Sequence, residues 1–322
     1  MLLTMNKILI IDSTHPLLKQ MLEAYGFDCE INTEIDYNKL SNIINNYTGI
    51  VIRSRITLDK EILSKATKLK FIGRVGSGLE SIDTGFAKSK NIECINSPEG
   101  SRDAVGEQAV GILLSVLTNI NKSNAEIKNG HWLREENRGT EIKGKTVGII
   151  GYGNMGSSFA KKLSGFEVNV ISYDKYKTNY SDGYTKEVAL NYIFEHSDIV
   201  SLHVPLTEET KYMVNSKFIN KFKKNIYLIN TSRGLVVETE SLLNAIDTGK
   251  IKGAGLDVIE YEESSFDKMD LDNMPATFYY LLNNPKVIIT PHSAGWTHES
   301  KIKLAEVLAS KIISFSKKTG IV

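Results

Sequence analysis

The chain has 322 residues, enough for two domains of ordinary size, and 41% of them are apolar and 24% charged. This is a soluble globular composition, and the net charge of +1 gives no support for a nucleic-acid or membrane-surface partner. Apolar runs such as 110–117 are too short to span a bilayer, and the first residues do not lead into a signal-peptide core. Cys29 and Cys94 lack metal or redox spacing, so we expect a cytoplasmic protein without a metal site.

The first hundred residues alternate between strand-like and helix-like segments. Short apolar runs rich in β-branched residues, such as 7–12 and 49–53, indicate buried strands. Strands alternating with helices predict a parallel sheet covered on both faces, so this part should form a complete α/β domain. The expected strands are 7–12, 49–53, 69–75 and 91–95, and the expected helices are 16–24, 58–65 and 82–89.

Two strand ends in this first domain carry groups suited to a ligand. Arg53-Ser-Arg55 follows one strand and Gly76-Ser-Gly78 follows the next. Ligands of open parallel sheets bind beyond the carboxyl ends of the strands, where arginine forks hold anions and a glycine turn exposes backbone N–H groups. Either feature alone would be a surface arginine pair or a tight turn. Their shared location favours substrate contacts from Arg53, Arg55, Gly76 and Gly78.

A long apolar helix over 104–120 is expected to lead into a second domain. The central stretch of this second domain is 145–156. The strand 146–150 runs into Gly151-x-Gly153-x-x-Gly156, a helix is expected over 157–163, and a strand over 168–173 ends at Asp174. This spacing is typical of a dinucleotide-binding fold. A strand, a glycine turn, a helix, a second strand and an acid in this order argue against the alternative, which is a glycine turn that binds no ligand.

Each part of this stretch has a physical role in binding a dinucleotide. Gly151 makes the tight turn, Gly153 lets the backbone approach a pyrophosphate, and Gly156 lets the helix lie close to the strand. The N–H groups at the start of the helix face the phosphate charge. Asp174 can accept hydrogen bonds from ribose hydroxyls and would repel a 2′-phosphate, so NAD is the expected cofactor rather than NADP.

Four later strands, over 198–203, 226–230, 253–258 and 287–290, bring polar groups to one edge of the second sheet. Their ends carry His203, Arg233, Glu262 and His292, with Glu260 close to Glu262. Arginine can hold a carboxylate, histidine can exchange a proton with an alkoxide, and glutamate can fix the histidine ring and favour its protonated form. Taken singly, His292 would be interpreted as a turn residue, Arg233 as an ion-pair partner and Glu262 as a solvated acid. Together, beside a nicotinamide, they suit hydride transfer to a 2-oxo acid.

These motifs together resemble the D-2-hydroxyacid dehydrogenases over nearly the whole chain. The family order is kept in Gly-Tyr-Gly-Asn-Met-Gly, Asp174, His203-Val-Pro-Leu-Thr, Asn230-Thr-Ser-Arg-Gly, Gly255-Leu-Asp-Val and Thr290-Pro-His-Ser-Ala-Gly. The resemblance implies that Arg233, Glu262 and His292 are catalytic, with Glu260 as the rival to Glu262. Besides the three glycines and Asp174, it implies cofactor contacts from Ser77, Asn154, Met155, His203, Val204, Thr231, Ser232, Asp257, Ser293, Ala294 and Gly295.

The resemblance also implies a domain organisation. We expect two Rossmann-like domains with parallel sheets: a flavodoxin-like substrate domain of 1–100 plus 296–322 and an NAD domain of 101–295, with the active site in the cleft between them. A terminal amphipathic helix over 300–315 would complete the first domain. Homodimers formed through the NAD domain are usual in such proteins.

Within the family, phosphoglycerate dehydrogenase is the subfamily that the Arg-Ser-Arg and Gly-Ser-Gly turns resemble. Glu262 is followed by Glu263-Ser-Ser, where the family usually has proline, and the segment 266–284 is longer than usual. The alternatives are a glyoxylate or hydroxypyruvate reductase and, in another class, an NADH-sensing binding protein. Trp132 and Trp296 are interpreted as packing residues.

Overall fold

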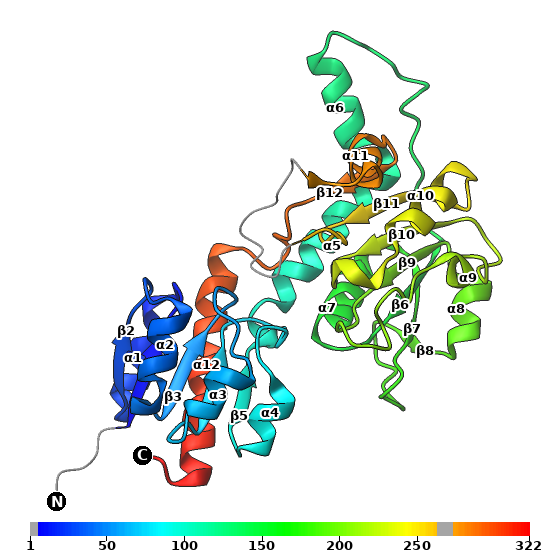
Figure 1. The fold of residues 1–322 in the computed structure, drawn as a ribbon. Helices are drawn as coiled ribbons and strands as arrows, with labels where there is room; N and C mark the ends of the chain where they lie inside the picture. The colour runs from blue at the N-terminus through cyan, green and yellow to red at the C-terminus, as the bar shows by residue number, and fades with distance from the viewer. Residues whose placement is uncertain (1–5, 263–272) are drawn as a thin grey trace, which may run out of the picture. The chain divides into compact units, whose positions relative to one another are not determined.

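The computed structural model describes residues 6–262 and 273–322, which form two compact units (Figure 1). One unit comprises the described residues of Met1–Ser101 and Trp296–Val322. The other comprises those of Arg102–Glu263 and Asp267–Gly295. Each unit contains one parallel sheet with helices on its faces, so the prediction of two parallel α/β domains is confirmed.

The first unit has a five-stranded sheet in the order β2-β1-β3-β4-β5, and all its neighbouring strands are parallel. This order is the flavodoxin-like one. The strands are β1 (Lys7–Ile10), β2 (Asp28–Ile31), β3 (Gly49–Ile52), β4 (Phe71–Arg74) and β5 (Glu93–Asn96). The helices are α1 (Pro16–Tyr25), α2 (Tyr37–Ile43), α3 (Lys60–Lys65), α4 (Thr84–Ser89) and α12 (His298–Thr319), with short 3-10 turns η1 (Ile44–Asn46) and η2 (Pro98–Gly100).

Alternate residues of β1 enter different cores because successive strand side chains point to opposite faces. Leu9 packs with residues of α2, α3 and α4 on one face. Ile8 and Ile10 pack with α1 and α12 on the other. The C-terminal helix α12 therefore supplies apolar cover, including Leu308 and Ile312, to a sheet built from the start of the chain.

The second unit has a seven-stranded parallel sheet in the order β12-β11-β10-β9-β6-β7-β8, which is the Rossmann order with one further strand (Figure 1). The strands are β6 (Thr146–Ile150), β7 (Asn169–Tyr173), β8 (Lys186–Glu187), β9 (Ile199–Leu202), β10 (Ile226–Asn230), β11 (Ile251–Leu256) and β12 (Val287–Ile289). The helices are α5 (Arg102–Thr118), α6 (Ile120–Lys128), α7 (Asn154–Lys162), α8 (Leu190–His196), α9 (Ser216–Ile219), α10 (Thr239–Asp247) and α11 (Ala276–Asn283), with 3-10 turns η3 (Leu163–Phe166) and η4 (Gly234–Val236).

Two helix layers bury the faces of this second sheet. Residues of α5 and α7 pack on one side, and residues of α8, α9, α10 and α11 pack in the other core cluster. The helix expected over 104–120 runs from Arg102 to Thr118, and Asn119, with φ +56, separates it from α6. None of the helices that the structure describes is long and apolar enough to cross a membrane.

Candidate active site

The glycine turn after β6 leaves room for a ligand beside its backbone. Gly151 has φ +93, a conformation that favours glycine, and α7 begins at Asn154, three residues earlier than predicted. A Cβ at Gly156 would lie 2.1 Å from the Gly151 carbonyl oxygen, whereas a Cβ at Gly153 would meet nothing within 4 Å. Asn154 and Met155 therefore belong to the first helical turn, whose N–H groups suit a pyrophosphate.

Asp174 follows β7 and is held by two backbone donors. Its Oδ2 accepts from the Tyr152 N–H at 2.8 Å and its Oδ1 from the Tyr176 N–H at 2.9 Å. The two lysines beside it are engaged elsewhere: Lys175 pairs with Glu209, and Lys177 Nζ donates to the Tyr152 carbonyl at 2.7 Å. The two backbone hydrogen bonds hold the Asp174 carboxylate in place after β7, and its contact with a ribose stays a prediction.

His203 lies where β9 meets the glycine turn. A Cβ at Gly151 would be 2.4 Å from the His203 carbonyl oxygen, and His203 Nε2 lies 2.9 Å from Ser201 Oγ. Burial lowers the pKa of His203 to about 3, which favours the neutral ring near pH 7. Among the described residues, its Nδ1 and the Thr231 Oγ1 are buried without a hydrogen-bond partner, and a bound dinucleotide is a group that could supply one.

His292 and Glu262 form a close pair in the loops after β12 and β11. His292 Nδ1 lies 2.7 Å from Glu262 Oε2, and Glu262 Oε1 accepts from the Ile259 N–H at 2.6 Å. Their side chains are 25% and 14% exposed, so the pair is largely shielded yet reachable. With Nδ1 on the carboxylate, Nε2 is the ring atom that can exchange a proton with a substrate.

The turn that carries His292 is built around Asp257. His292 has φ +50, a left-handed conformation, and its N–H donates to the Asp257 carbonyl at 2.8 Å. The buried Asp257 carboxylate accepts from Thr290 Oγ1 at 2.6 Å and from the Ser293 and Ala294 N–H groups at 2.9 Å each. Burial raises the pKa of Asp257, against these hydrogen bonds, which lower it. Asp257 thus shapes the turn; its contact with a cofactor stays a prediction.

Glu260, the rival to Glu262, makes different contacts. Its Oε1 accepts from Tyr212 Oη at 2.8 Å and its Oε2 from the Thr239 N–H at 2.9 Å. The structure therefore pairs His292 with Glu262, while Glu260 joins the loop before α9 to the start of α10.

Arg233 lies in the loop after β10, the strand beside β11. A Cβ at the next residue, Gly234, would be 1.8 Å from the Ile259 carbonyl oxygen, so the Arg233 loop lies against the segment that leads to Glu262. Asn230 Nδ2 donates to the Arg233 carbonyl at 3.0 Å, which fixes the turn, and Arg233 Nη1 donates to the Ser232 carbonyl at 2.7 Å. The three predicted catalytic residues thus stand in consecutive loops at one sheet edge.

Arg53 and Arg55 of the first unit make different contacts. Arg55 donates from Nε to the buried Asp12 carboxylate at 3.1 Å and from its two Nη atoms to the Ile35 and Ile11 carbonyls at 2.6 Å each. Arg53 donates its backbone N–H to Asp12, and its guanidinium carbon lies 4.5 Å from the centre of the Trp296 ring. Trp296 is 67% exposed, so its interpretation as a packing residue is wrong, and the same holds for Trp132. Sequence reasoning missed Asp12, although an acid ending the strand beside Arg-Ser-Arg was a usable signal.

The Gly-Ser-Gly turn after β4 is also held within the first unit. Gly76 has φ +144, and its N–H donates to Ser97 Oγ at 3.2 Å. The Ser77 carbonyl accepts from Asn96 Nδ2 at 2.6 Å. The substrate contacts of Gly76 and Gly78 and the cofactor contact of Ser77 stay predictions, as do the cofactor contacts of Val204 and Gly295.

This arrangement is the one that an oxidoreductase with a nicotinamide dinucleotide is expected to have. Residues 110–294 match the family model "D-isomer specific 2-hydroxyacid dehydrogenase, NAD binding domain". The chain is 34% identical over 286 residues to a hydroxypyruvate reductase of Thermotoga maritima, covering 88% of this chain and 90% of that protein. It is 33% identical over 311 residues to a D-3-phosphoglycerate dehydrogenase of Methanocaldococcus jannaschii, covering 96% of this chain but 57% of that protein.

A solved structure agrees with these matches. D-lactate dehydrogenase of Aquifex aeolicus, complexed with NAD and lactic acid, superposes with a TM-score of 0.81 at 28% identity, covering 97% of this chain and 96% of that one. The chain belongs to the D-isomer specific 2-hydroxyacid dehydrogenase family and is an NAD-dependent oxidoreductase.

Proposed function

We propose that the protein transfers a hydride between nicotinamide and the C2 carbon of a 2-oxo acid, with Arg233, Glu262 and His292 as its catalytic residues. The observation that carries this proposal is the 2.7 Å contact between His292 Nδ1 and Glu262 Oε2, beside the loop of Arg233. Bound NADH supplies the hydride. The glycine turn and Asp174 would hold its pyrophosphate and ribose.

Each catalytic residue has a separate task in this proposal. Arg233 binds the substrate carboxylate in its planar fork and polarises the adjacent carbonyl. His292 Nε2 donates a proton to the oxygen at C2 as the hydride arrives, and takes it back in the oxidation. Glu262 holds the ring through Nδ1 and stabilises its positive charge. Asp257 acts indirectly, by shaping the turn that presents His292.

As substrate we propose phosphohydroxypyruvate, with 3-phosphoglycerate as the reverse substrate and serine biosynthesis as the setting. Arg53, which follows β3, supports this choice because a second arginine can bind an anion at the far end of a 2-oxo acid. Reduction of hydroxypyruvate or glyoxylate is the second candidate, because a hydroxypyruvate reductase is matched at 34% identity over 90% of its length.

The test is NADH oxidation with phosphohydroxypyruvate, hydroxypyruvate, glyoxylate and pyruvate. We expect the highest kcat/KM for phosphohydroxypyruvate. A higher value for hydroxypyruvate or glyoxylate would select the second candidate. Tight NADH binding with turnover of none of the four would indicate a sensor instead of an enzyme. Arg233→Lys keeps the charge but loses the fork, so it should impair all 2-oxo acids alike.

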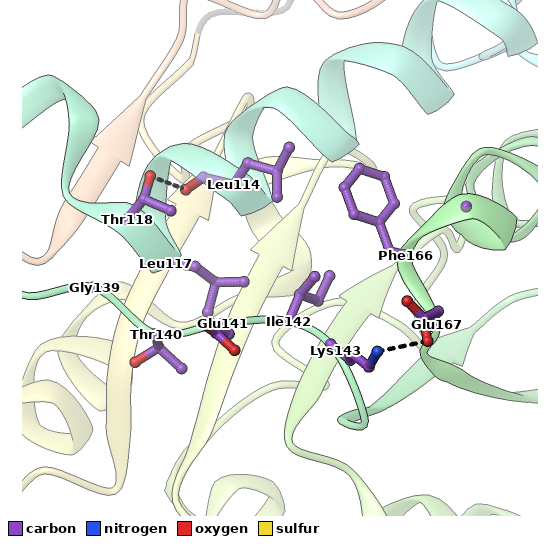
Figure 2. Close-up of a pocket in the computed structure, with 11 residues that line it drawn as sticks. Leu114, Leu117, Thr118, Gly139, Thr140, Glu141, Ile142, Lys143, Phe166 and Glu167 are labelled. Atoms are coloured by element: carbon purple, nitrogen blue, oxygen red, sulfur yellow. Dashed lines mark hydrogen bonds and ion pairs between the residues drawn. The ribbon is translucent and has the colours of Figure 1, made fainter.

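We also propose a homodimer formed through the NAD-binding unit. Helix α6 buries none of its residues, and Ile127 and Trp132 are 48% and 78% exposed. Nearby in the same unit, a hollow of about 580 Å³ has Leu114, Leu117 and Phe166 among its lining residues (Figure 2). Exposed apolar groups of this extent favour a protein partner. Light scattering should give a dimer mass, and Trp132→Asp should lower it; a monomeric wild type would exclude the proposal.

A cytoplasmic location is a further proposal. Cys29 and Cys94 are both unpaired, as is usual in a reducing compartment. Fractionation of the source cells, with an antibody to the chain, would test it.

A further inference from the structure

The loops that follow β7 and β9 meet at one acidic side chain, Glu209. Strand β6 lies between β7 and β9 in the parallel sheet, so these two loops flank the glycine turn that follows β6 (Figure 1). Glu209 forms an ion pair with Lys175, and its Oε2 accepts a hydrogen bond from Tyr176 Oη at 2.7 Å. Glu209 therefore joins the loop after β9 to the two residues that directly follow Asp174.

The Glu209 carboxylate holds Lys175 and the neighbouring aromatic ring together. Lys175 Nζ pairs with Glu209 Oε1 and lies over the Tyr176 ring, 5.7 Å from its centre, while Oε2 takes the hydroxyl of that ring. The ammonium of Lys175 is therefore engaged by a charge and by a ring at once. The side chains of Lys175 and Glu209 are 53% and 47% exposed, so either can be replaced without opening the core.

The position of Lys175 in the fold gives this contact a chemical meaning. An acid at the end of this strand suits the ribose hydroxyls of NAD, whereas a nearby cation accommodates the 2′-phosphate of NADP. Lys175 is such a cation by its charge and by its place directly after Asp174. Lys177, two residues further on, donates to the Tyr152 carbonyl at 2.7 Å. This strand end thus carries both an acid that suits NAD and a lysine that would suit NADP.

We propose that Glu209 is a specificity-determining residue that favours NAD over NADP by engaging Lys175, which would otherwise bind the 2′-phosphate. A 2′-phosphate has to compete with the Glu209 carboxylate for the lysine, and it meets the negative charges of Asp174 and Glu209. NAD has a hydroxyl at that position and needs no cation, so it can bind while the ion pair stays intact. This inference rests on the proposed function, in which Asp174 would hold the ribose.

The experiment measures the dissociation constants of NADH and NADPH by calorimetric titration, without substrate. The proteins are wild type, Glu209→Ala, Lys175→Met and the Glu209→Ala/Lys175→Met double variant, and the quantity compared is the ratio of the NADPH constant to the NADH constant. Glu209→Ala should lower this ratio by about three- to tenfold, because the released lysine gains a charge-assisted contact with the 2′-phosphate. The effect is smaller than for a buried contact because the lysine is half exposed.

The double variant shows whether Glu209 acts through Lys175. We expect its ratio to return to the wild-type value, because no lysine is left to bind the phosphate. Lys175→Met alone should not lower the ratio, because Glu209 already engages the lysine in wild type. An unchanged ratio in Glu209→Ala would overturn the inference, and so would a ratio that stays low in the double variant.

A matched control is Glu61→Ala, which breaks another exposed lysine–glutamate pair. Lys65 and Glu61 pair at 3.5 Å in the first unit, and their side chains are 48% and 68% exposed. The control should keep the wild-type ratio, and a fall equal to that of Glu209→Ala would show a general effect of charge and overturn the inference.

Asp174→Ala separates this inference from the nucleotide site on which it rests. If Asp174→Ala narrows the preference for NAD while Glu209→Ala leaves the ratio unchanged, the inference fails and the proposed ribose contact stands. If neither variant changes the ratio, both the inference and the proposed ribose contact fail.

Discussion

The two units use the same architecture, yet their first strands end in opposite ways. In the second unit, β6 leads into a glycine turn, and the N-terminus of α7 is capped by Gly153, which has no side chain there. In the first unit, β1 leads to the buried Asp12, and the His15 side chain and Pro16 close the start of α1. The turn of the first unit, with Asp12, binds arginine, and the glycine turn of the second unit is open to phosphate. A few residues at the strand–helix turn, and not the sheet order, therefore decide which unit can hold the dinucleotide.

The proposed proton transfer belongs to the second unit, and the largest expected effect is on His292. His292→Ala should slow turnover by about 10²–10⁴-fold, the usual size of an acid–base contribution, and leave NADH affinity nearly intact. Stopped-flow reduction at several pH values, with NADH binding measured by fluorescence, checks this. A mutant that keeps the wild-type rate and pH profile would show that another group is the acid.

Glu262 and Glu260 lie in the same loop, and we expect only Glu262 to affect catalysis. Glu262→Gln removes the carboxylate charge beside His292 Nδ1, so kcat for reduction should fall by about ten- to hundredfold, the size of a lost charge-assisted hydrogen bond. Glu260→Gln is the matched control and should keep the wild-type kcat, because Glu260 contacts Tyr212 and Thr239 instead. Steady-state kinetics of both variants decide, and a loss in Glu260→Gln alone would reverse the roles.

One added methyl group in the glycine turn after β6 should weaken nucleotide binding. Gly153→Ala places a Cβ in open space, so the fold should be kept while the pyrophosphate loses its close approach. We expect NADH affinity to fall roughly ten- to hundredfold, the size of a lost charge-assisted contact. Calorimetric titration measures it, with Gly165→Ala as the control, because a Cβ there also meets nothing within 4 Å. Unchanged affinity would place the pyrophosphate elsewhere.

The contact between Arg55 and Asp12 should matter for the stability of the first unit. Arg55→Ala leaves the Asp12 carboxylate buried without its cation, which should lower the free energy of unfolding by about 1–2 kcal/mol. This lies below the range for a fully buried pair because the Arg55 side chain is 36% exposed. Urea denaturation measures the free energy of unfolding of Arg55→Ala and of Lys65→Ala. Lys65→Ala removes an exposed ion pair, because the side chains of Lys65 and Glu61 are 48% and 68% exposed. If Arg55→Ala costs no more than Lys65→Ala, the contact between Arg55 and Asp12 is not structural.

The smallest effect concerns cofactor choice. Wild type should prefer NAD over NADP, and Asp174→Ala should narrow the preference about fivefold, the scale of one like-charge repulsion near the surface. Titration of both cofactors measures the ratio. Lys177→Met should change it little, because Lys177 is bound to the Tyr152 carbonyl. Equal or tighter NADP binding by wild type would refute the preference.

Local patterns were enough to place most of the elements that carry these groups. The strand predicted over 146–150 is β6 residue for residue, and the predicted strands of the first sheet correspond to β1, β3, β4 and β5. The missed elements include the edge strand β2 and the helix α6. β2 has only four residues, two of them exposed, and α6 buries none, so neither shows a clear apolar pattern.

The sequence by itself determined the two parallel sheets, the glycine turn and the acid after β7, because strand periodicity and glycine geometry are local properties of the backbone. Only the tertiary structure decided among side chains of the same kind. It paired His292 with Glu262 across 30 residues, bound Glu260 to Tyr212 across 48, and held Arg55 on Asp12. Such choices depend on which loops meet at a sheet edge, and a hydrogen bond between distant loops leaves no periodic trace in the chain.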